Sequence, residues 1–244
     1  MTYLVAFAEH RDLTKIRASS PETWRRVRRY NLPVQLALAA AEDVMAFAAD
    51  SNAVVVISLA PCQPGSAELY RWGDVVTSRM LNGTLGDLRM NPTQTLHAVD
   101  NLAMSAFAIT FGNHADCLGL GGAAGQAWSG LEAVMERIED GAGEVLLMAG
   151  DQDQASETAV GLGIAILFSN RARPFQPVNR AVRLARIQRH SNDRTAATIP
   201  HSANGLSELV AAVASPRAES IAYEVPTHHT DGHSSITVVL ETGS

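Results

Sequence analysis

Apolar residues fall into two kinds of run along this chain, and each kind predicts a different element. The run from Val34 to Ala48 is rich in Ala and Leu and has helical periodicity, which predicts a helix that packs against a sheet. The run from Ala53 to Leu59 is short and continuously apolar, which is typical of a buried parallel strand. Because elements of both kinds alternate along the chain, the pattern indicates an α/β layered fold.

The same pattern predicts the remaining elements. We expect strands at the N-terminus and over residues 117–120, 145–149, 159–168, 180–189, 220–225 and 235–241, and helices over 66–81, 104–111, 126–138 and 207–214. A further helix begins at Ser20-Pro21-Glu22, because a serine cap, a first-turn proline and an acidic residue are the usual signals of a helix start. No repeat or low-complexity linker interrupts these elements, so we predict one domain over residues 1–244.

Composition narrows the possible partners and the compartment. The 244 residues are 46% hydrophobic, enough for one large core, and the net charge of -6 disfavours nucleic-acid binding. The first residues lack the positively charged region of a signal peptide, and no apolar run is long enough to span a membrane. Two cysteines without a CxxC pair fit a reducing compartment and indicate no zinc site. We therefore expect a cytoplasmic protein with no metal and no cofactor.

Three motifs follow one another between Asn91 and Asp151. The segment NPTQTLHAVDNLAMSAFAITFG ends at Gly112, the glycine-rich turn GLGGAAG spans residues 119–125, and the strand-like GEVLLMAGD spans 143–151. In this order they resemble the middle of a β-ketoacyl synthase. Blocks over roughly residues 30–173 are similar to the same family, and GHSSITVVLE at 232–241 resembles its closing strand. The resemblance implies a thiolase-like layered fold of the α-β-α-β-α type, truncated to about one half and closed by a C-terminal strand.

The reactive cysteine of that family is missing. The family places its nucleophile at the turn before a buried helix, where this sequence has only Gly122, Ala123 and Ala124. Without a thiolate there, the acyl-transfer step is lost. A cysteine-free chain of this size resembles the small chain length factors of type II polyketide synthases, especially those of aryl polyene synthesis. The resemblance implies a non-catalytic subunit that forms a heterodimer with a catalytic ketosynthase, receives chains from an acyl carrier protein and shapes the acyl tunnel.

The resemblance also implies two sets of functional residues. The resemblance places tunnel-gating side chains near one face of the 66–81 helix, and the residues at helical spacing on that face are Trp72, Val75 and Arg79. An apolar stripe at this spacing is more commonly part of the core. The family dimerises through the strand that leads into the nucleophile turn, and this interface is expected to be largely apolar. Here that strand comprises Asp116, Cys117, Leu118, Gly119, Leu120 and Gly121.

Other interpretations of single motifs stay open. Cys117 is a buried core thiol or, in an independent acyl-transferring or hydrolytic enzyme, a displaced nucleophile assisted by one histidine of the 228–233 turn. The histidines of that turn are His228, His229 and His233, whose spacing matches no standard zinc signature. A homodimeric scaffold that binds carrier protein is a third possibility.

Two further motifs have a functional and a structural interpretation. The glycine cluster at 119–125 lacks the acidic residue of a dinucleotide site, which favours close helix–strand packing. Four arginines fall within residues 25–29 and form either a solvated helix face or a surface for an acidic carrier protein. They are Arg25, Arg26, Arg28 and Arg29.

Overall fold

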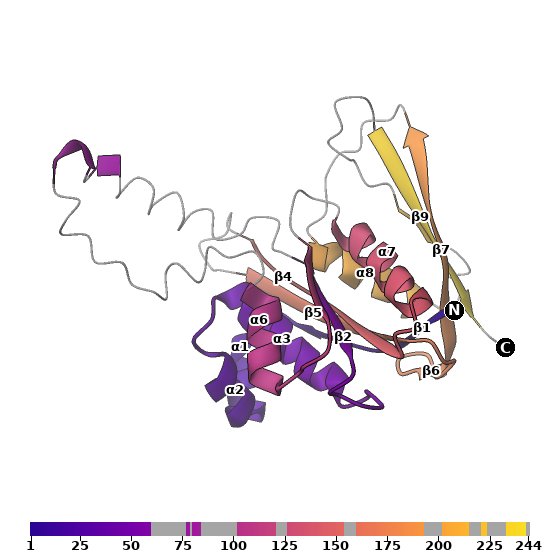
Figure 1. The fold of residues 1–244 in the computed structure, drawn as a ribbon, viewed down its shortest axis with the longest axis horizontal. Coiled ribbons are helices and arrows are strands. Elements are labelled where there is room, and N and C mark those ends of the chain that lie inside the picture. Colours follow the sequence, from indigo (N-terminus) through magenta and orange to yellow (C-terminus); the bar gives the residue numbers. More distant parts are fainter. Residues whose placement is uncertain are drawn as a thin grey trace.

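A single mixed sheet forms the centre of the molecule (Figure 1). The computed structural model describes residues 1–59, 77–78, 80–83, 102–120, 126–153, 160–192, 202–214, 221–223 and 233–242. Within these residues the sheet has nine strands in the order β3-β2-β4-β5-β1-β7-β9-β8, with β6 paired to β7. The strands are β1 (Thr2–His10), β2 (Val55–Leu59), β3 (Cys117–Leu120), β4 (Glu144–Asp153), β5 (Val160–Ser169), β6 (Pro174–Phe175), β7 (Arg180–Asn192), β8 (Ile221–Tyr223) and β9 (His233–Thr242).

Parallel and antiparallel pairing divide the sheet into two parts. β3, β2 and β4 run parallel, and every other pair is antiparallel. Because the three parallel strands share one direction, their carboxyl ends meet at the same edge, which is where the segments 121–125 and 154–159 begin.

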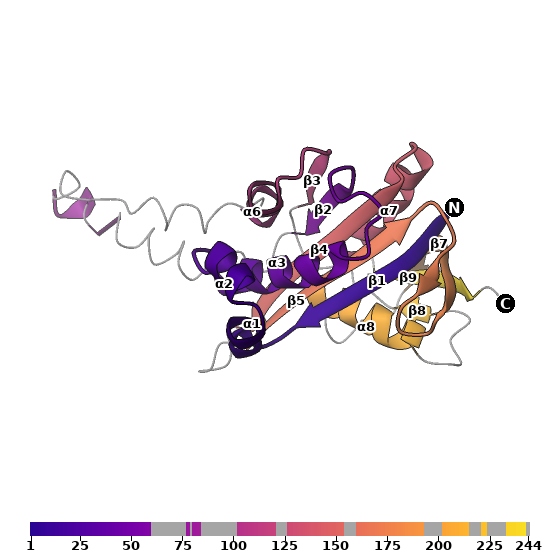
Figure 2. The ribbon, with the colours of Figure 1, turned by 90° about the horizontal axis from the view of Figure 1, so that it is seen from below.

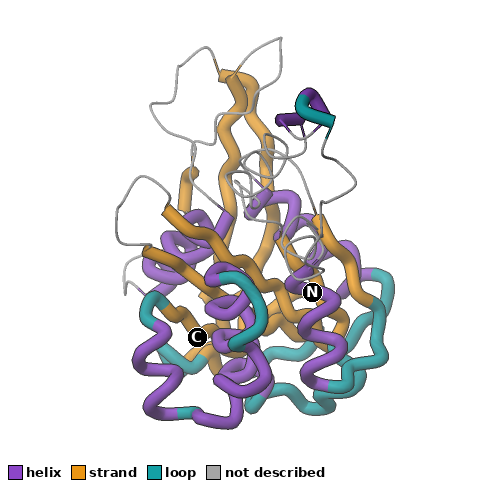
Figure 3. Tube along the Cα trace, turned by 90° about the vertical axis from the view of Figure 1, so that its left-hand side faces the viewer, coloured by secondary structure: helices purple, strands orange, loops and turns teal. Residues whose placement is uncertain are grey.

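Helices cover both faces of the sheet, which gives three layers (Figures 1 and 3). On one face lie α1 (Leu13–Ser19), α2 (Pro21–Val27), α3 (Leu32–Met45) and α6 (Leu102–Phe111); on the other lie α7 (Gln126–Glu139) and α8 (Ser202–Ala214). Each face buries its own apolar cluster, as expected when a sheet is sandwiched between helices. The α/β layered fold predicted from the sequence is confirmed, and the described residues form one α-β-α sandwich.

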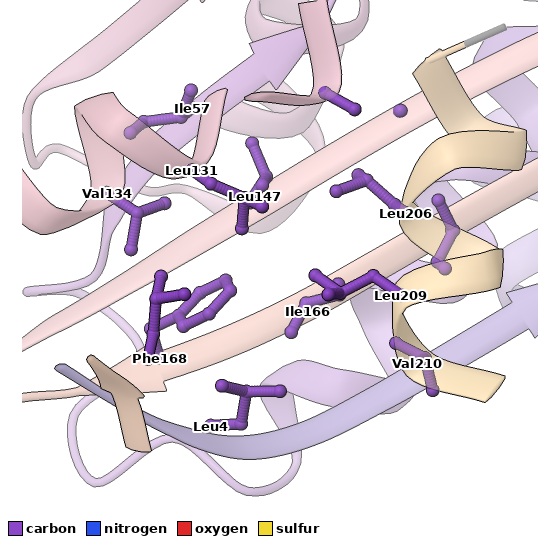
Figure 4. Close-up of a cluster of buried hydrophobic side chains, with 14 of the residues drawn as sticks. Leu4, Ile57, Leu131, Val134, Leu147, Ile166, Phe168, Leu206, Leu209 and Val210 are labelled. Carbon is purple, nitrogen blue, oxygen red and sulfur yellow. The ribbon is translucent and has the colours of Figure 1, made fainter. Parts of the chain in front are cut away.

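Figure 4 shows the cluster under α7 and α8. Side chains from both helices meet side chains from four strands, and all of those labelled are at most 2% exposed. The labelled residues are Leu4, Ile57, Leu131, Val134, Leu147, Ile166, Phe168, Leu206, Leu209 and Val210. Burial of these aliphatic and aromatic groups, at about 25 cal/mol per Å² of apolar surface, is the main favourable term that holds the layers together.

Close contact with glycines in β4 and β5 fixes the position of α3. A Cβ added to Gly150 would overlap the carbonyl group of Pro33, and one added to Gly163 would overlap the backbone at Leu36 and Ala37. Because only glycine leaves this space empty, the helix backbone lies directly on the strands. The helix itself starts at the Asn31 cap, whose side chain accepts a hydrogen bond from the Val34 N–H.

Most predicted elements are confirmed, with a few differences. The helix over 207–214 extends back to Ser202, and two short elements, α1 and β6, had no strong sequence signal. α1 has only seven residues and starts at an Asp12 cap. The predicted helix over 66–81 lies mostly outside the described residues. The single-domain prediction remains a prediction.

Candidate interface and nucleophile turn

β3 forms one edge of the sheet. It pairs with β2, and within the described part of the chain no strand lies on its other side. The Val56 N–H donates to the Asp116 carbonyl at 3.0 Å. Since backbone groups in a parallel ladder alternate in direction, the N–H and C=O groups of Cys117 and Gly119 face away from β2. This edge thus offers unpaired donors and acceptors to another strand.

A buried asparagine fixes the position of this edge strand. Asn113 is 5% exposed, and its amide donates to the carbonyls of Ser51 and Val54, both at 3.1 Å. Its side-chain oxygen accepts from the Ala115 N–H at 2.9 Å. These bonds join the loop before β3 to the loop before β2, so the two strands enter the sheet in register. Sequence reasoning missed this role, because its one nearby signal is weak: a helix end at Gly112, whose φ in the structure is 64°.

α6 provides an apolar surface beside the edge. It packs on β2, β3 and α3 through a buried side that includes Ala106 and Phe107. Figure 2 shows the helix beside β2 and β3. Its opposite side carries Ile109, which is 71% exposed. A single exposed apolar side chain is common on protein surfaces, so Ile109 is of interest here only because α6 packs beside the open β3 edge.

Cys117, the first residue of β3, lacks the environment of a nucleophile. Its side chain is half-buried against the α3 and α6 cluster, and Sγ lies 3.5 Å from the Ala115 carbonyl oxygen. Burial, and secondly the charge of Asp116, raise the pKa of the Cys117 thiol above its ordinary value. A reactive cysteine needs the opposite shift, so that the thiolate is populated near neutral pH. The structure therefore favours the core-thiol interpretation.

The nucleophile turn itself lies outside the described residues, together with Gly121, Gly122, Ala123 and Ala124. The helix that follows it, α7, is described. Trp128, in its first turn, is 1% exposed and belongs to the core under α8. Two residues later, a Cβ on Gly130 would come within 2.9 Å of a Leu59 methyl carbon, so α7 lies close to β2. In the first turn of this helix, Ala127 and Trp128 are thus buried in the core, whereas Ser129 is exposed.

A buried carboxylate links β4 to α8. Asp151 ends the GEVLLMAGD motif, is 4% exposed and accepts a hydrogen bond from the Ala203 N–H at 2.6 Å. The unpaired N–H groups at a helix start favour a negative charge, so this contact fixes the N-terminus of α8 to the sheet. Sequence analysis did not identify this role because the partner lies far along the chain.

A cavity of about 390 Å³ lies at the other end of the parallel strands, beside Ala53 and Gly143. An ion pair forms part of its wall: Arg173 Nη1 lies 2.6 Å from Glu144 Oε1, and Arg173 Nη2 donates to the Phe47 carbonyl at 2.8 Å. Glu144 also accepts from the Ala49 N–H at 2.8 Å. The polar groups here bind one another, so they fix the end of α3 to the sheet.

The structure leaves several predicted site residues untested. Trp72, Val75, Arg79, His228 and His229 lie outside the described residues. His233 begins β9, opposite Asn192 of β7. Among the described residues there is no cluster of three or more His, Cys, Asp or Glu side chains suited to a metal ion, and no helix long and apolar enough to cross a membrane.

Comparison with known proteins identifies the fold. The sequence matches no protein-family model and no curated protein sequence. The structure is similar to that of an ishigamide ketosynthase/chain length factor, at a TM-score of 0.62 and 12% identity, over 100% of this chain and 99% of the other. The structure is also similar to that of a ketosynthase in complex with its chain length factor from Xenorhabdus doucetiae. The TM-score is 0.60 and the identity 12%, over 88% of this chain and 80% of the other.

A ketosynthase domain for oxazolomycin from Streptomyces albus gives a TM-score of 0.50 and 10% identity, over 98% of this chain and 95% of the other. The chain therefore has the thiolase-like fold found in ketosynthases and chain length factors, as the sequence resemblance predicted.

Proposed function

We propose that this chain is a non-catalytic subunit of the chain length factor type, which forms a heterodimer with a catalytic β-ketoacyl synthase and shapes its acyl tunnel. One observation carries the proposal: a ketosynthase-like fold presents an open strand edge, β3, directly before a turn that has no nucleophile in its sequence. The partner supplies the cysteine and histidines of catalysis, and this chain supplies the facing wall.

The second candidate, an independent acyl-transferring or hydrolytic enzyme, depends on Cys117. The raised pKa of this thiol argues against it, because the neutral thiol is a poor nucleophile. The location of Cys117 argues against it as well. It begins β3 and is not in the first turn of a helix, where the helix dipole would stabilise a thiolate.

The pairing surface combines backbone and side-chain contacts. The outward N–H and C=O groups at Cys117 and Gly119 allow the partner to continue the sheet, and such pairing gives both affinity and register. The exposed face of α6 adds apolar area beside that edge. An interface of this kind is expected to be obligate and largely apolar.

The proposed tunnel wall consists of Trp72, Val75 and Arg79. The bulk of Trp72 limits how far a growing chain extends, and an acyl carrier protein delivers that chain to the pair. The fold and the sequence position support this assignment, and no cofactor or metal enters it.

Co-expression with a ketosynthase encoded in the same genome tests the pairing. Size-exclusion chromatography and intact mass should show a one-to-one complex. Gly119→Pro removes an N–H that faces away from β2, so this variant should remain folded and lose the partner. Ile109→Lys should weaken the complex in the same way. Ala18→Lys places the same charge on exposed α1 and serves as the matched control, which should pair normally.

Circular dichroism melting separates lost pairing from lost folding. Variants at Gly119 and Ile109 that melt like the parent yet still form the complex would contradict the proposed interface. A stable homodimer that excludes the ketosynthase would instead support the scaffold hypothesis. Acylation of the isolated chain that disappears in Cys117→Ala would support the enzyme.

Trp72→Ala tests the tunnel wall in the reconstituted pair. Because truncation opens volume for the growing chain, products should become longer or more varied while the rate of initiation stays nearly unchanged. A Trp72 side chain in ordinary core would instead cost about 3–5 kcal/mol of stability on truncation. Lower thermal stability with products of unchanged length would overturn the assignment.

A further inference from the structure

Positive charge is concentrated in one short part of the chain. Seven basic and two acidic residues lie between Arg11 and Arg29, a net charge of +5 in a sequence whose total is -6. In the structure this segment forms α1 and α2, which pack on each other and on α3 (Figures 1 and 2). Their outer surface exposes Arg11, Arg17, Arg25, Arg26, Arg28 and Arg29. We call these six side chains the arginine surface.

Aromatic rings fix part of the arginine surface in place. The Arg17 guanidinium lies over the Trp24 ring at 4.2 Å from its centroid, which joins α1 to α2. The Arg29 guanidinium lies 5.0 Å from the centroid of the Tyr30 ring. A stacked guanidinium keeps its charge and its remaining donors, so these two groups are ordered before any partner arrives.

Two other arginines in this surface have no acidic partner. Arg11 pairs with Glu9 and Arg26 with Glu22, each at 2.6 Å, whereas Arg25 and Arg28 form no ion pair with any described residue. Exposed charges of one sign are normally mixed with the other sign on a soluble surface. A segment with a net charge of +5, in which Arg25 and Arg28 lack acidic partners, on a chain of opposite net charge therefore points to an external anionic partner.

The shape and surroundings of the cluster favour a protein as that partner. Each helix has seven residues and is about 10 Å long, which matches the width of a single acidic helix. A nucleic-acid duplex extends beyond this surface and meets the acidic remainder of the chain. A membrane surface normally also receives apolar side chains, and none of the large exposed apolar residues described lies on α1 or α2.

We infer that the arginine surface is a docking surface for an acidic protein helix. α1 and α2 pack on each other and on α3, whereas α6 packs on β2 and β3, so the surface is not part of the β3 edge and stays open when that edge is paired. In the proposed complex this partner is the acyl carrier protein, and only that identity rests on the proposed function. The docking itself depends on charge alone and is tested without a ketosynthase.

Fluorescence anisotropy with a short labelled poly-L-glutamate tests the inference. The parent should bind at low salt and release the probe as salt rises, because the contacts are between exposed charges. Arg25→Glu with Arg28→Glu should weaken binding by about tenfold or more, since each reversal replaces an attraction by a repulsion. Arg171→Glu with Arg186→Glu makes the same change in net charge at exposed sites elsewhere and should bind like the parent.

Circular dichroism confirms that both double variants fold, and a DNA duplex and vesicles rich in phosphatidylserine are measured in parallel. Equal loss of poly-L-glutamate binding in the two double variants would overturn the inference, and so would no binding by the parent. Tighter binding of the duplex or of the vesicles would overturn the choice of a protein partner. Failure here with an intact ketosynthase complex would leave the proposed pairing unaffected.

Discussion

Gly163→Ala offers a direct test of how closely α3 lies on the sheet. The substitution adds one methyl group at a point in β5 where the α3 backbone at Leu36 and Ala37 occupies the space. A flexible side chain would move aside at low cost, but a helix backbone cannot. α3 must therefore shift away from β5, or β5 must bend.

The expected loss of stability depends on how many contacts of α3 are disturbed when the helix moves. α3 has ten buried residues, and it also touches Gly150 of β4, so moving it loosens a large contact. Overpacking of a well-packed core costs about 1–3 kcal/mol, and an immovable backbone obstacle puts this site near the upper end. For a chain of this size, about 2–3 kcal/mol lowers the melting temperature by about 4–12 °C.

Thermal and urea denaturation followed by circular dichroism measure this cost. Gly143→Ala is the matched control, because a Cβ there meets nothing within 4 Å. It should leave stability unchanged or raise it by about 0.4–1 kcal/mol through lower entropy of the unfolded chain. If Gly163→Ala unfolds at the same temperature and urea concentration as Gly143→Ala, the close contact between α3 and β5 is wrong.

Three further predictions concern single polar groups. In a Cys62→Ser background, iodoacetamide should label Cys117 more slowly in the folded than in the unfolded protein at mildly alkaline pH, because the raised pKa of this thiol reduces the thiolate fraction. The same shift makes stability depend on pH. The stability linked to it is present below the pKa of the thiol in the unfolded chain and is lost as pH rises through the pKa of the thiol in the folded protein. Asp151→Ala should cost about 1–3 kcal/mol in urea denaturation, since it leaves the Ala203 N–H of α8 buried without its acceptor, and Asp151→Asn should recover part of this. Arg173→Ala should cost about 1–3 kcal/mol of stability in urea denaturation, because Glu144 loses its ion-pair partner. Combining Arg173→Ala with Glu144→Gln should restore part of that stability. If the losses of the two single variants simply add in the double variant, the two side chains are not coupled.

Local pattern was sufficient to predict most elements. The run at Val34–Ala48 and the strand at 145–149 are confirmed, because each has enough consecutive residues for periodicity to show. α1 was missed for the same reason: in seven residues only Leu13 and Ile16 turn toward α3, which is too few to establish a period.

Contacts between distant residues could not be predicted in this way. The sequence places Gly163 in a strand, but only the fold shows that α3 lies over it. Asn113 and Asp151 look like ordinary polar residues at element ends, and their roles depend on carbonyl and N–H groups brought close by the sheet order. The resemblance located β3 as a candidate interface, while its position at the sheet edge required the topology.

The place of β1 in the sheet has a consequence for synthesis of the protein. β1 is made long before its partners, because it lies in the interior of the sheet between β5 and β7, which begin at Val160 and Arg180. During translation the apolar residues of β1 therefore remain unpaired until β5, which begins at Val160, has left the ribosome. Folding dominated by such long-range pairing is slow and populates intermediates that expose apolar surface and are prone to aggregate. We expect nascent chains of this protein to depend on chaperones until β5 emerges, and shortened chains that end before it to aggregate.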